Sequence, residues 1–192
     1  MRTAKYKRDT TETKIEGFLD LDGKGIFKGT TGLGFLDHML TLFAFHGSFD
    51  LELNITGDLH VDSHHTMEDC GIVLGTMIRE ALGDRMGIYR YGSFTIPMDE
   101  TLISVYLDIS NRPVLVYGIR FTREYLGECA TEDFGEFFRG LTNAAGMTLH
   151  LVQHYGENNH HIIEGAFKAF GRALRQGVTI TGEGVSSTKG LL

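Results

Sequence analysis

The sequence predicts an α+β fold built by internal duplication of a half-domain. Segments with strand periodicity and segments with helical periodicity are mixed along the chain, without the regular strand–helix alternation of a doubly wound sheet. A motif of two histidines followed by a glutamate opens at His64 and again at His160. The offset between the two copies is 96 residues, which is half of the 192-residue chain.

In the first half of the chain, four segments carry a clear signal. Apolar and polar residues alternate over 15–21 and over 49–55, as they do in half-buried strands. Residues 72–82 place their apolar side chains on one face of a helix, and a further helix is expected over 37–46. We therefore expect several strands and two helices in this half.

The second half shows the same kinds of element. Alternation over 102–109 predicts a strand, and the two prolines of the chain, Pro97 and Pro113, each lie near a strand boundary. A helix is expected over 131–146, and the apolar face of 162–174 predicts another. This half again has several strands and two helices.

The duplication extends beyond the histidine motif. Residues 37–40 precede the first histidine pair much as residues 136–139 precede the second. We therefore expect a single domain over 1–192, made of two repeats at roughly 1–90 and 91–192. Three further pairs keep the 96-residue offset: Asp62 with Asn158, Gly75 with Gly171, and Arg79 with Arg175.

Composition excludes several classes of protein. The formal net charge is −7 and no run of basic residues occurs, which argues against a nucleic-acid partner. The polar first residues and the lack of a long apolar segment predict neither secretion nor a membrane span. Cys70 and Cys129 lie too far apart in the sequence for a disulfide framework or a thiolate metal site, so we expect a cytoplasmic protein.

Each histidine pair is expected at the start of a helix, because residues of the N-cap type precede it: Asp62 or Ser63 in one repeat, Asn158 or Asn159 in the other. Glu68 follows His64 by four residues and His65 by three, which places its carboxylate beside both imidazoles. Adjacent histidines point about 100° apart on a helix, so each motif is expected to serve two metal ions.

Together with upstream His38 and Glu136, the two motifs would complete two sites of mixed imidazole and carboxylate ligands. That donor set suits Mn²⁺, Fe²⁺ or Zn²⁺ and argues against Ca²⁺. The alternative is that each pair is only a polar helix cap; two copies at duplicated positions favour metal binding. A zinc protease is not indicated, since its glutamate would lie between the histidines.

Six motifs, in order and over essentially the whole chain, resemble imidazoleglycerol-phosphate dehydratase of histidine biosynthesis. They are GFLDHML at 34–40, DSHHTMED at 62–69, PMDE at 97–100, SNRP at 110–113, NHHIIE at 159–164 and STKG at 187–190. The resemblance implies two duplicated α+β halves like ribosomal S5 domain 2. It also implies a homo-oligomer of 24 subunits built from trimers, with two Mn²⁺ per active site at subunit interfaces.

The resemblance also assigns residues. The implied metal ligands are His38, His64, His65, Glu68, Glu136, His160, His161 and Glu164, where Glu136 stands at a position that is often histidine in the family. The implied substrate contacts are these ligands apart from Glu136, together with Glu12, His46, Arg90, Arg112, Lys168, Ser187, Thr188 and Lys189. The implied proton-transferring carboxylate is one of Glu12, Glu68 and Glu164.

The implied reaction is loss of water from imidazole-glycerol phosphate to give imidazole-acetol phosphate. Two metal ions on the imidazole ring would favour the imidazolate, which can expel hydroxide, and the arginines and lysines suit a phosphate dianion. Two alternatives remain: another di-metal enzyme, such as a phosphatase, and a metal-binding or storage shell without catalysis.

Overall fold

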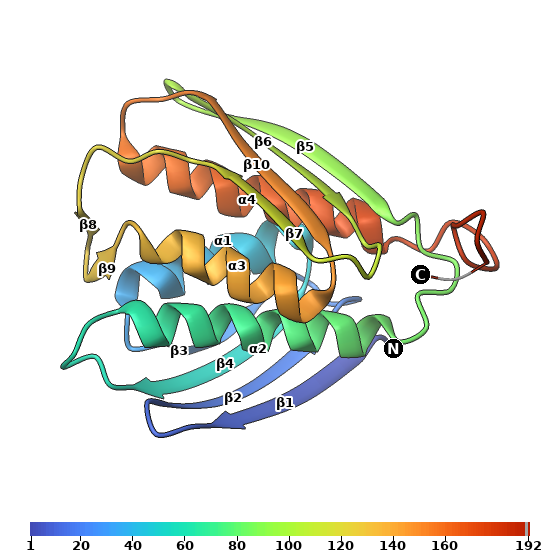
Figure 1. The fold of residues 1–192 in the computed structure, drawn as a ribbon, viewed down its shortest axis with the longest axis horizontal. Coiled ribbons are helices and arrows are strands. Elements are labelled where there is room, and N and C mark those ends of the chain that lie inside the picture. Colours follow the sequence, from blue (N-terminus) through green and yellow to red (C-terminus); the bar gives the residue numbers. More distant parts are fainter. Residues whose placement is uncertain (191) are drawn as a thin grey trace.

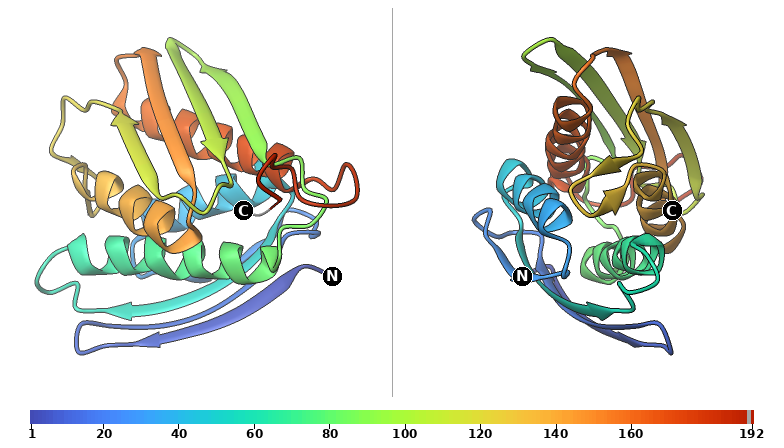
Figure 2. Two further views of the ribbon diagram at one scale, coloured as in Figure 1. Left: turned by 45° about the vertical axis from the view of Figure 1, so that its right-hand side comes forward. Right: turned by 90° about the vertical axis from the view of Figure 1, so that its left-hand side faces the viewer.

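The computed structural model describes residues 1–190 and 192. Within this part of the chain, two four-stranded sheets form the outer layers and four helices lie between them (Figure 1). Figure 2 shows the same layers from two further directions. Each sheet therefore has one face on the helices and one face outward.

The first half forms one sheet and two helices. The sheet has the order β1-β2-β4-β3, in which only the β3–β4 pair is parallel. Helix α1 connects β3 to β4, and α2 follows β4. The bounds are β1 Thr3–Asp9, β2 Thr13–Asp20, β3 Phe27–Thr30, α1 Gly34–Gly47, β4 Asp50–Gly57 and α2 His64–Leu82.

The second half repeats this arrangement. Its sheet has the order β5-β6-β10-β7 with a parallel β7–β10 pair, and a small β8–β9 hairpin is added before α3. The α+β prediction with duplicated halves is confirmed. The bounds are β5 Tyr91–Met98, β6 Thr101–Asp108, β7 Val114–Gly118, β8 Tyr125–Leu126, β9 Cys129–Ala130, α3 Asp133–Ala145, β10 Thr148–Tyr155 and α4 Asn159–Val178.

The helices pack across the repeats, α1 against α4 and α2 against α3. Glycines allow the close approach. A Cβ at Gly75 on α2 would lie 2.3 Å from the carbonyl oxygen of Leu141 on α3, and a Cβ at Gly171 on α4 would lie 2.7 Å from that of Phe43 on α1. The same contact thus recurs with an offset of 96 residues between α2 and α4 and of 98 residues between α1 and α3.

Aromatic side chains join the two halves in one hydrophobic core. Phe43 of the first repeat stacks on Phe170 of the second with ring centroids 5.2 Å apart. Within the second repeat, Phe137 and Phe138 of α3 both contact Phe167 of α4, at 5.3 and 5.2 Å between centroids. Burial of these large rings stabilises the cross-repeat α1–α4 pair and the contact of α3 with α4, since each ring removes well over 100 Å² of apolar surface from water.

The close approach at Gly75 gives a first prediction. We expect Gly75→Ala to lower the free energy of unfolding by about 1–3 kcal/mol, because its methyl group would overlap the Leu141 carbonyl. Gly34→Ala is the control, as a Cβ at Gly34 meets no atom within 4 Å. Denaturant unfolding of the metal-free protein measures both variants, and an equal effect at the two positions would contradict this view of the packing.

Candidate active site

Both histidine motifs lie at helix starts, as expected. In α2 the backbone N–H of His64 donates to Asp62 Oδ1 at 2.9 Å, and in α4 that of His160 donates to Asn158 Oδ1 at 2.9 Å. The two bonds are 96 residues apart. They satisfy an N–H group that a helix start leaves without a partner, and so fix where each pair begins.

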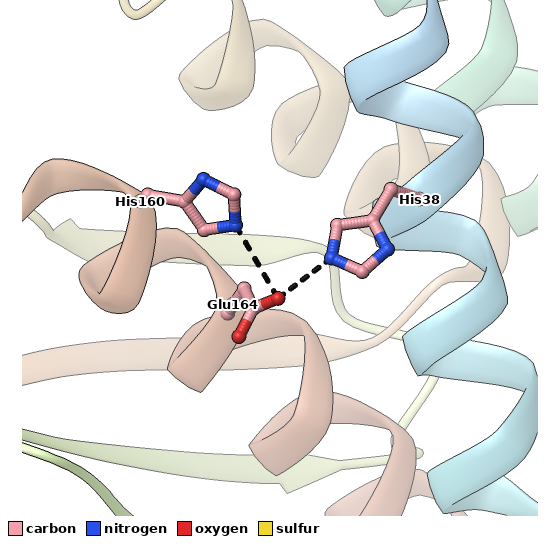
Figure 3. Close-up of side chains that lie close together, drawn as sticks. All are labelled: His38, His160 and Glu164. Atoms are coloured by element: carbon pink, nitrogen blue, oxygen red, sulfur yellow. Dashed lines mark hydrogen bonds and ion pairs between the residues drawn. The ribbon is translucent and has the colours of Figure 1, made fainter.

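Three of the expected ligands come together at the second motif, where α1 meets α4 (Figure 3). Oε1 of Glu164 lies 2.6 Å from Nε2 of His38 and 3.4 Å from Nε2 of His160. One ligand atom from each of the three residues lies within 4.8 Å of the other two. This spacing and its nitrogen–oxygen donor set fit a single divalent ion such as Mn²⁺, Fe²⁺ or Zn²⁺.

The carboxylate of this cluster is buried, with Glu164 only 6% exposed. Burial by itself raises the pKa of Glu164, but hydrogen bonds from Lys168 and His38 outweigh it, so the pKa lies below its ordinary value. The Lys168 ammonium is 3.0 Å from Glu164 Oε2. Glu164 is therefore held as an anion, which is the form that binds a metal ion.

The second histidine of each motif faces different carboxylates. Nδ1 of His65 is 3.0 Å from Asp58 Oδ2, and Nδ1 of His161 is 2.8 Å from Glu100 Oε2. Glu164 thus lies beside His160, whereas His161 pairs with Glu100, because neighbouring imidazoles on a helix point in different directions. The hydrogen bond to Asp58 raises the pKa of His65.

Glu12 reaches the first motif from the turn between β1 and β2. Its Oε1 is 3.7 Å from Nε2 of His65, the ring nitrogen that Asp58 leaves free. The side chain is exposed. Glu12 is thus a carboxylate at the edge of the expected metal site, which suits proton exchange with a bound substrate.

At the first motif the remaining expected ligands stay apart. Nδ1 of His64 is 3.2 Å from Asp133 Oδ1, and Glu136 forms its ion pair with Arg139 at 3.2 Å. Within residues 1–190 and 192, Glu68 forms no ion pair with either histidine of its motif, and no metal-like cluster other than that of His38 is found. The chain alone therefore gathers one partial site, at the second motif.

The 98-residue offset between α1 and α3 relates His38 to Glu136. Both lie within the first five residues of helices that pack against a histidine-bearing helix: His38 is on α1, which packs against α4, and Glu136 is on α3, which packs against α2. By this repeat, Glu136 is placed relative to the first motif as His38 is placed relative to the second motif.

The expected phosphate contacts other than Lys168, which pairs with Glu164, form a separate group. Arg90, Arg112 and the tail residues Ser187, Thr188 and Lys189 line one open cavity. The Arg90 guanidinium is bidentate on Asp108, with Nε–Oδ1 at 2.6 Å and Nη2–Oδ2 at 3.0 Å, and it also donates to the Ser186 carbonyl oxygen at 2.7 Å. The arginine thus anchors the C-terminal segment that carries the other phosphate-binding candidates.

His46 lies near the cationic side of α4. Burial lowers the pKa of His46, and the positive charges of Arg172 and Lys168 lower it further, so the ring is neutral at pH 7. Its buried Nδ1 has no hydrogen-bond partner among the described residues. Because Nδ1 is buried, a substrate contact of His46 would use the other ring nitrogen, Nε2.

The two groups of expected site residues lie at opposite ends of the molecule. Helices α2 and α4 begin at one end, whereas the start of β5 and the C-terminal segment lie at the other (Figure 1). Within one chain, the phosphate contacts Arg90, Arg112 and 187–189 are therefore separated from the histidine motifs, whereas Lys168 lies beside Glu164 of the second motif.

Four acidic residues at the site have no role in the sequence analysis: Asp58, Asp99, Glu100 and Asp133. Each touches a motif histidine from another element, so no local spacing reveals it. Asp99 and Glu100 do belong to the PMDE motif at 97–100, which contributes to the family resemblance but assigns them no role.

These features define a class: two-repeat α+β proteins that present paired histidines and carboxylates at helix starts. The family model for imidazoleglycerol-phosphate dehydratase matches residues 31–174. The dehydratase of Heliobacterium modesticaldum is 56% identical over the whole of both chains, and that of Clostridioides difficile is 50% identical, also over both whole chains.

Solved structures of the same enzyme share the fold. That from Staphylococcus aureus has a TM-score of 0.82 and 41% identity, covering 93% of this chain and 99% of its own. That from Pyrococcus furiosus has a TM-score of 0.83 and 40% identity, covering 97% and 100%. The chain belongs to the imidazoleglycerol-phosphate dehydratase family, the hydro-lyases of histidine biosynthesis.

In the part of the chain that the structure describes, no helix combines the length and the apolar character needed to cross a membrane.

Proposed function

We propose that this chain dehydrates imidazole-glycerol phosphate to imidazole-acetol phosphate with the help of bound divalent metal ions. Membership of the family supports the reaction. The cluster of His38, His160 and Glu164 is the observation that carries the metal dependence, because its three ligand atoms are spaced for one ion. We place the enzyme in the cytoplasm, as a biosynthetic enzyme with two buried free cysteines.

Two Mn²⁺ per active site, or Fe²⁺ or Zn²⁺ in their place, would be held by the eight proposed ligands: His38, His64, His65, Glu68, Glu136, His160, His161 and Glu164. When bound, the ions supply positive charge that favours loss of the imidazole proton. His65 and His161 each give Nδ1 to a carboxylate and so keep Nε2 free for this role.

Among the three candidate carboxylates, Glu12 is the one we assign to proton transfer. Glu164 is buried between His38, His160 and Lys168, which leaves it little freedom to accept and release a proton. Glu68 is the expected ligand of the first motif. Glu12 is exposed and reaches toward His65 from a turn, so it can meet the substrate at the edge of the site.

The phosphate group of the substrate would be bound by Arg90, Arg112, Lys168 and the tail residues Ser187, Thr188 and Lys189, while His46 contacts the substrate near Lys168. Arginine offers a planar fork to phosphate and lysine a point charge. Since one chain presents motif histidines and tail residues at opposite ends, we propose that a complete site takes them from different subunits.

Product analysis tests the reaction. We expect incubation with imidazole-glycerol phosphate and Mn²⁺ to yield the ketone imidazole-acetol phosphate without release of inorganic phosphate. Phosphate release would instead indicate a di-metal phosphatase, and metal binding without turnover would indicate a storage shell; either result contradicts the proposal.

We further propose that residues 1–192 form one domain, with repeats at roughly 1–90 and 91–192, and that it assembles into a homo-oligomer of 24 subunits built from trimers. The outward surface of the second half supports self-association: Tyr106, Val114 and Val116 are 46%, 49% and 44% exposed. Strand β1 of the first half instead exposes Lys5 and Lys7. Apolar side chains on a sheet exterior favour burial against another subunit.

Assembly and metal binding should be linked, because ions that bind only at subunit interfaces stabilise the oligomer. We expect a chelator to lower the mass measured by light scattering, and added Mn²⁺ to restore it. A mass equal to that of one 21.4 kDa chain under all conditions would exclude sites built between subunits.

The C-terminal segment gives a prediction about substrate binding. We expect Lys189→Ala to lower kcat/KM by about tenfold or more, since a charge-assisted contact contributes about 1.5–3 kcal/mol. Metal content and assembly should be unchanged, and inhibition by inorganic phosphate should weaken in parallel. Lys28→Ala is the control, an exposed lysine on β3 whose ion pair is with Glu52. Wild-type kcat/KM in the Lys189 variant would contradict a role of the C-terminal segment in phosphate binding.

A further inference from the structure

Asp133 is a buried carboxylate that the proposed ligand set does not use. It is the first residue of α3, and only 2% of it is exposed. Its Oδ2 accepts a hydrogen bond from the Ser63 hydroxyl, and its Oδ1 lies 3.2 Å from Nδ1 of His64. Removing a carboxylate from water costs free energy of folding unless hydrogen bonds or opposite charges compensate for the lost hydration.

The duplication supplies an internal comparison. The residue 98 positions before Asp133 is Phe35 on α1, and its ring contacts His160, the counterpart of His64, at 5.0 Å between centroids. In the second repeat, the position equivalent to Asp133 is thus occupied by an apolar ring, that of Phe35. The repeated helix packing does not by itself require a carboxylate here, so Asp133 is explained by its two polar partners in the first repeat, Ser63 and His64.

The other motif histidines show what such a carboxylate does. His65 and His161 each direct Nδ1 at a carboxylate, Asp58 and Glu100 respectively. A carboxylate on Nδ1 holds the proton there, orients the ring and makes Nε2 a stronger ligand. With Asp133 on His64, three of the four motif histidines share this arrangement.

We propose that Asp133 is a positioning residue, which holds His64 with Nδ1 protonated and Nε2 directed at a metal ion of the first motif. The inference rests on the proposed function, in which His64 is a metal ligand. It adds a residue on α3, three positions before Glu136, that prepares the first motif for its ion. Because the first motif lacks a counterpart of the His38–Glu164 bond, Asp133 is the group that orders its leading histidine.

The experiment measures binding of Mn²⁺ and of Co²⁺ alone to the full-length chain by competition with a chelator. We expect Asp133→Leu to weaken one of the two bound ions by about 10–100-fold and to leave the other unchanged. Asp133→Asn keeps an acceptor for Nδ1–H but loses the charge, so its loss should be smaller. The d–d absorption bands of the bound Co²⁺ should shift in both variants, which a purely structural role would not cause.

Ser63→Ala is the matched control, since it removes the other hydrogen bond of the same carboxylate and leaves the His64 contact in place. It should lower thermal stability with wild-type metal affinity. Wild-type affinity and unchanged Co²⁺ bands in both Asp133 variants, with an ion lost in His64→Ala, would overturn the inference alone. Retention of both ions in His64→Ala would overturn the ligand assignment of the proposed function as well.

Discussion

Replacing His160 by alanine is expected to remove a bound metal ion and to lower kcat by more than about 100-fold. Its Nε2 lies 3.4 Å from Glu164 and shares with His38 the cluster that fits one ion. Loss of a direct ligand should exceed the 10–100-fold cost typical of groups that only support a ligand. His64→Ala should have the same effect at the first motif. Metal content by elemental analysis and turnover are measured on the same preparation.

His60→Ala is the control for these variants, because His60 is exposed in a turn outside the motifs. It should keep wild-type metal content and activity. The His160 side chain is itself exposed, so its removal should not unfold the chain, and thermal unfolding of the metal-free proteins checks this. Full metal content and turnover in both motif variants would show that the clusters are not ligands.

Glu12→Gln is expected to lower kcat by a factor of about 10² to 10⁴, the usual contribution of a positioned acid or base. The amide has the same shape as the carboxylate but cannot exchange a proton, so Mn²⁺ affinity and assembly should be unchanged. Glu16→Gln is the control, an exposed glutamate on β2 that pairs with Lys7.

A Glu12→Gln enzyme with wild-type kcat would contradict the assignment of proton transfer to Glu12. A loss of bound Mn²⁺ in parallel with kcat would instead make Glu12 a ligand. The two results are separated by measuring metal content and turnover at saturating Mn²⁺.

The sequence alone predicted the fold class and most long elements. Strands over 15–21, 49–55 and 102–109 correspond to β2, β4 and β6, which are paired on both sides within their sheets. The edge strands β1, β3, β5 and β7 were missed, because an edge strand needs no strict alternation. The central strand β10 was missed as well, because only Leu149 and Leu151 among its residues are buried, which gives too short an alternation. In β1 only Ala4 is fully buried.

The histidine motifs were also found from the sequence, since capping and helical spacing are local properties. The 96-residue offset proved to be a structural repeat of α2 and α4, although the repeat of α1 and α3 has an offset of 98. What the sequence could not reveal are the carboxylates that orient the histidines. Asp58 and Glu100 lie on strand ends and turns, and only the folded chain brings them to α2 and α4.

Titration of metal-free protein with Mn²⁺ tests the central claim most directly, which is that the chain's histidines and carboxylates hold the metal on which dehydration depends. Each chain carries one set of the eight proposed ligands, so we predict that formation of imidazole-acetol phosphate rises from near zero and reaches its plateau at two Mn²⁺ per chain. Full activity in protein freed of metal, or a plateau unrelated to bound Mn²⁺, would contradict the account.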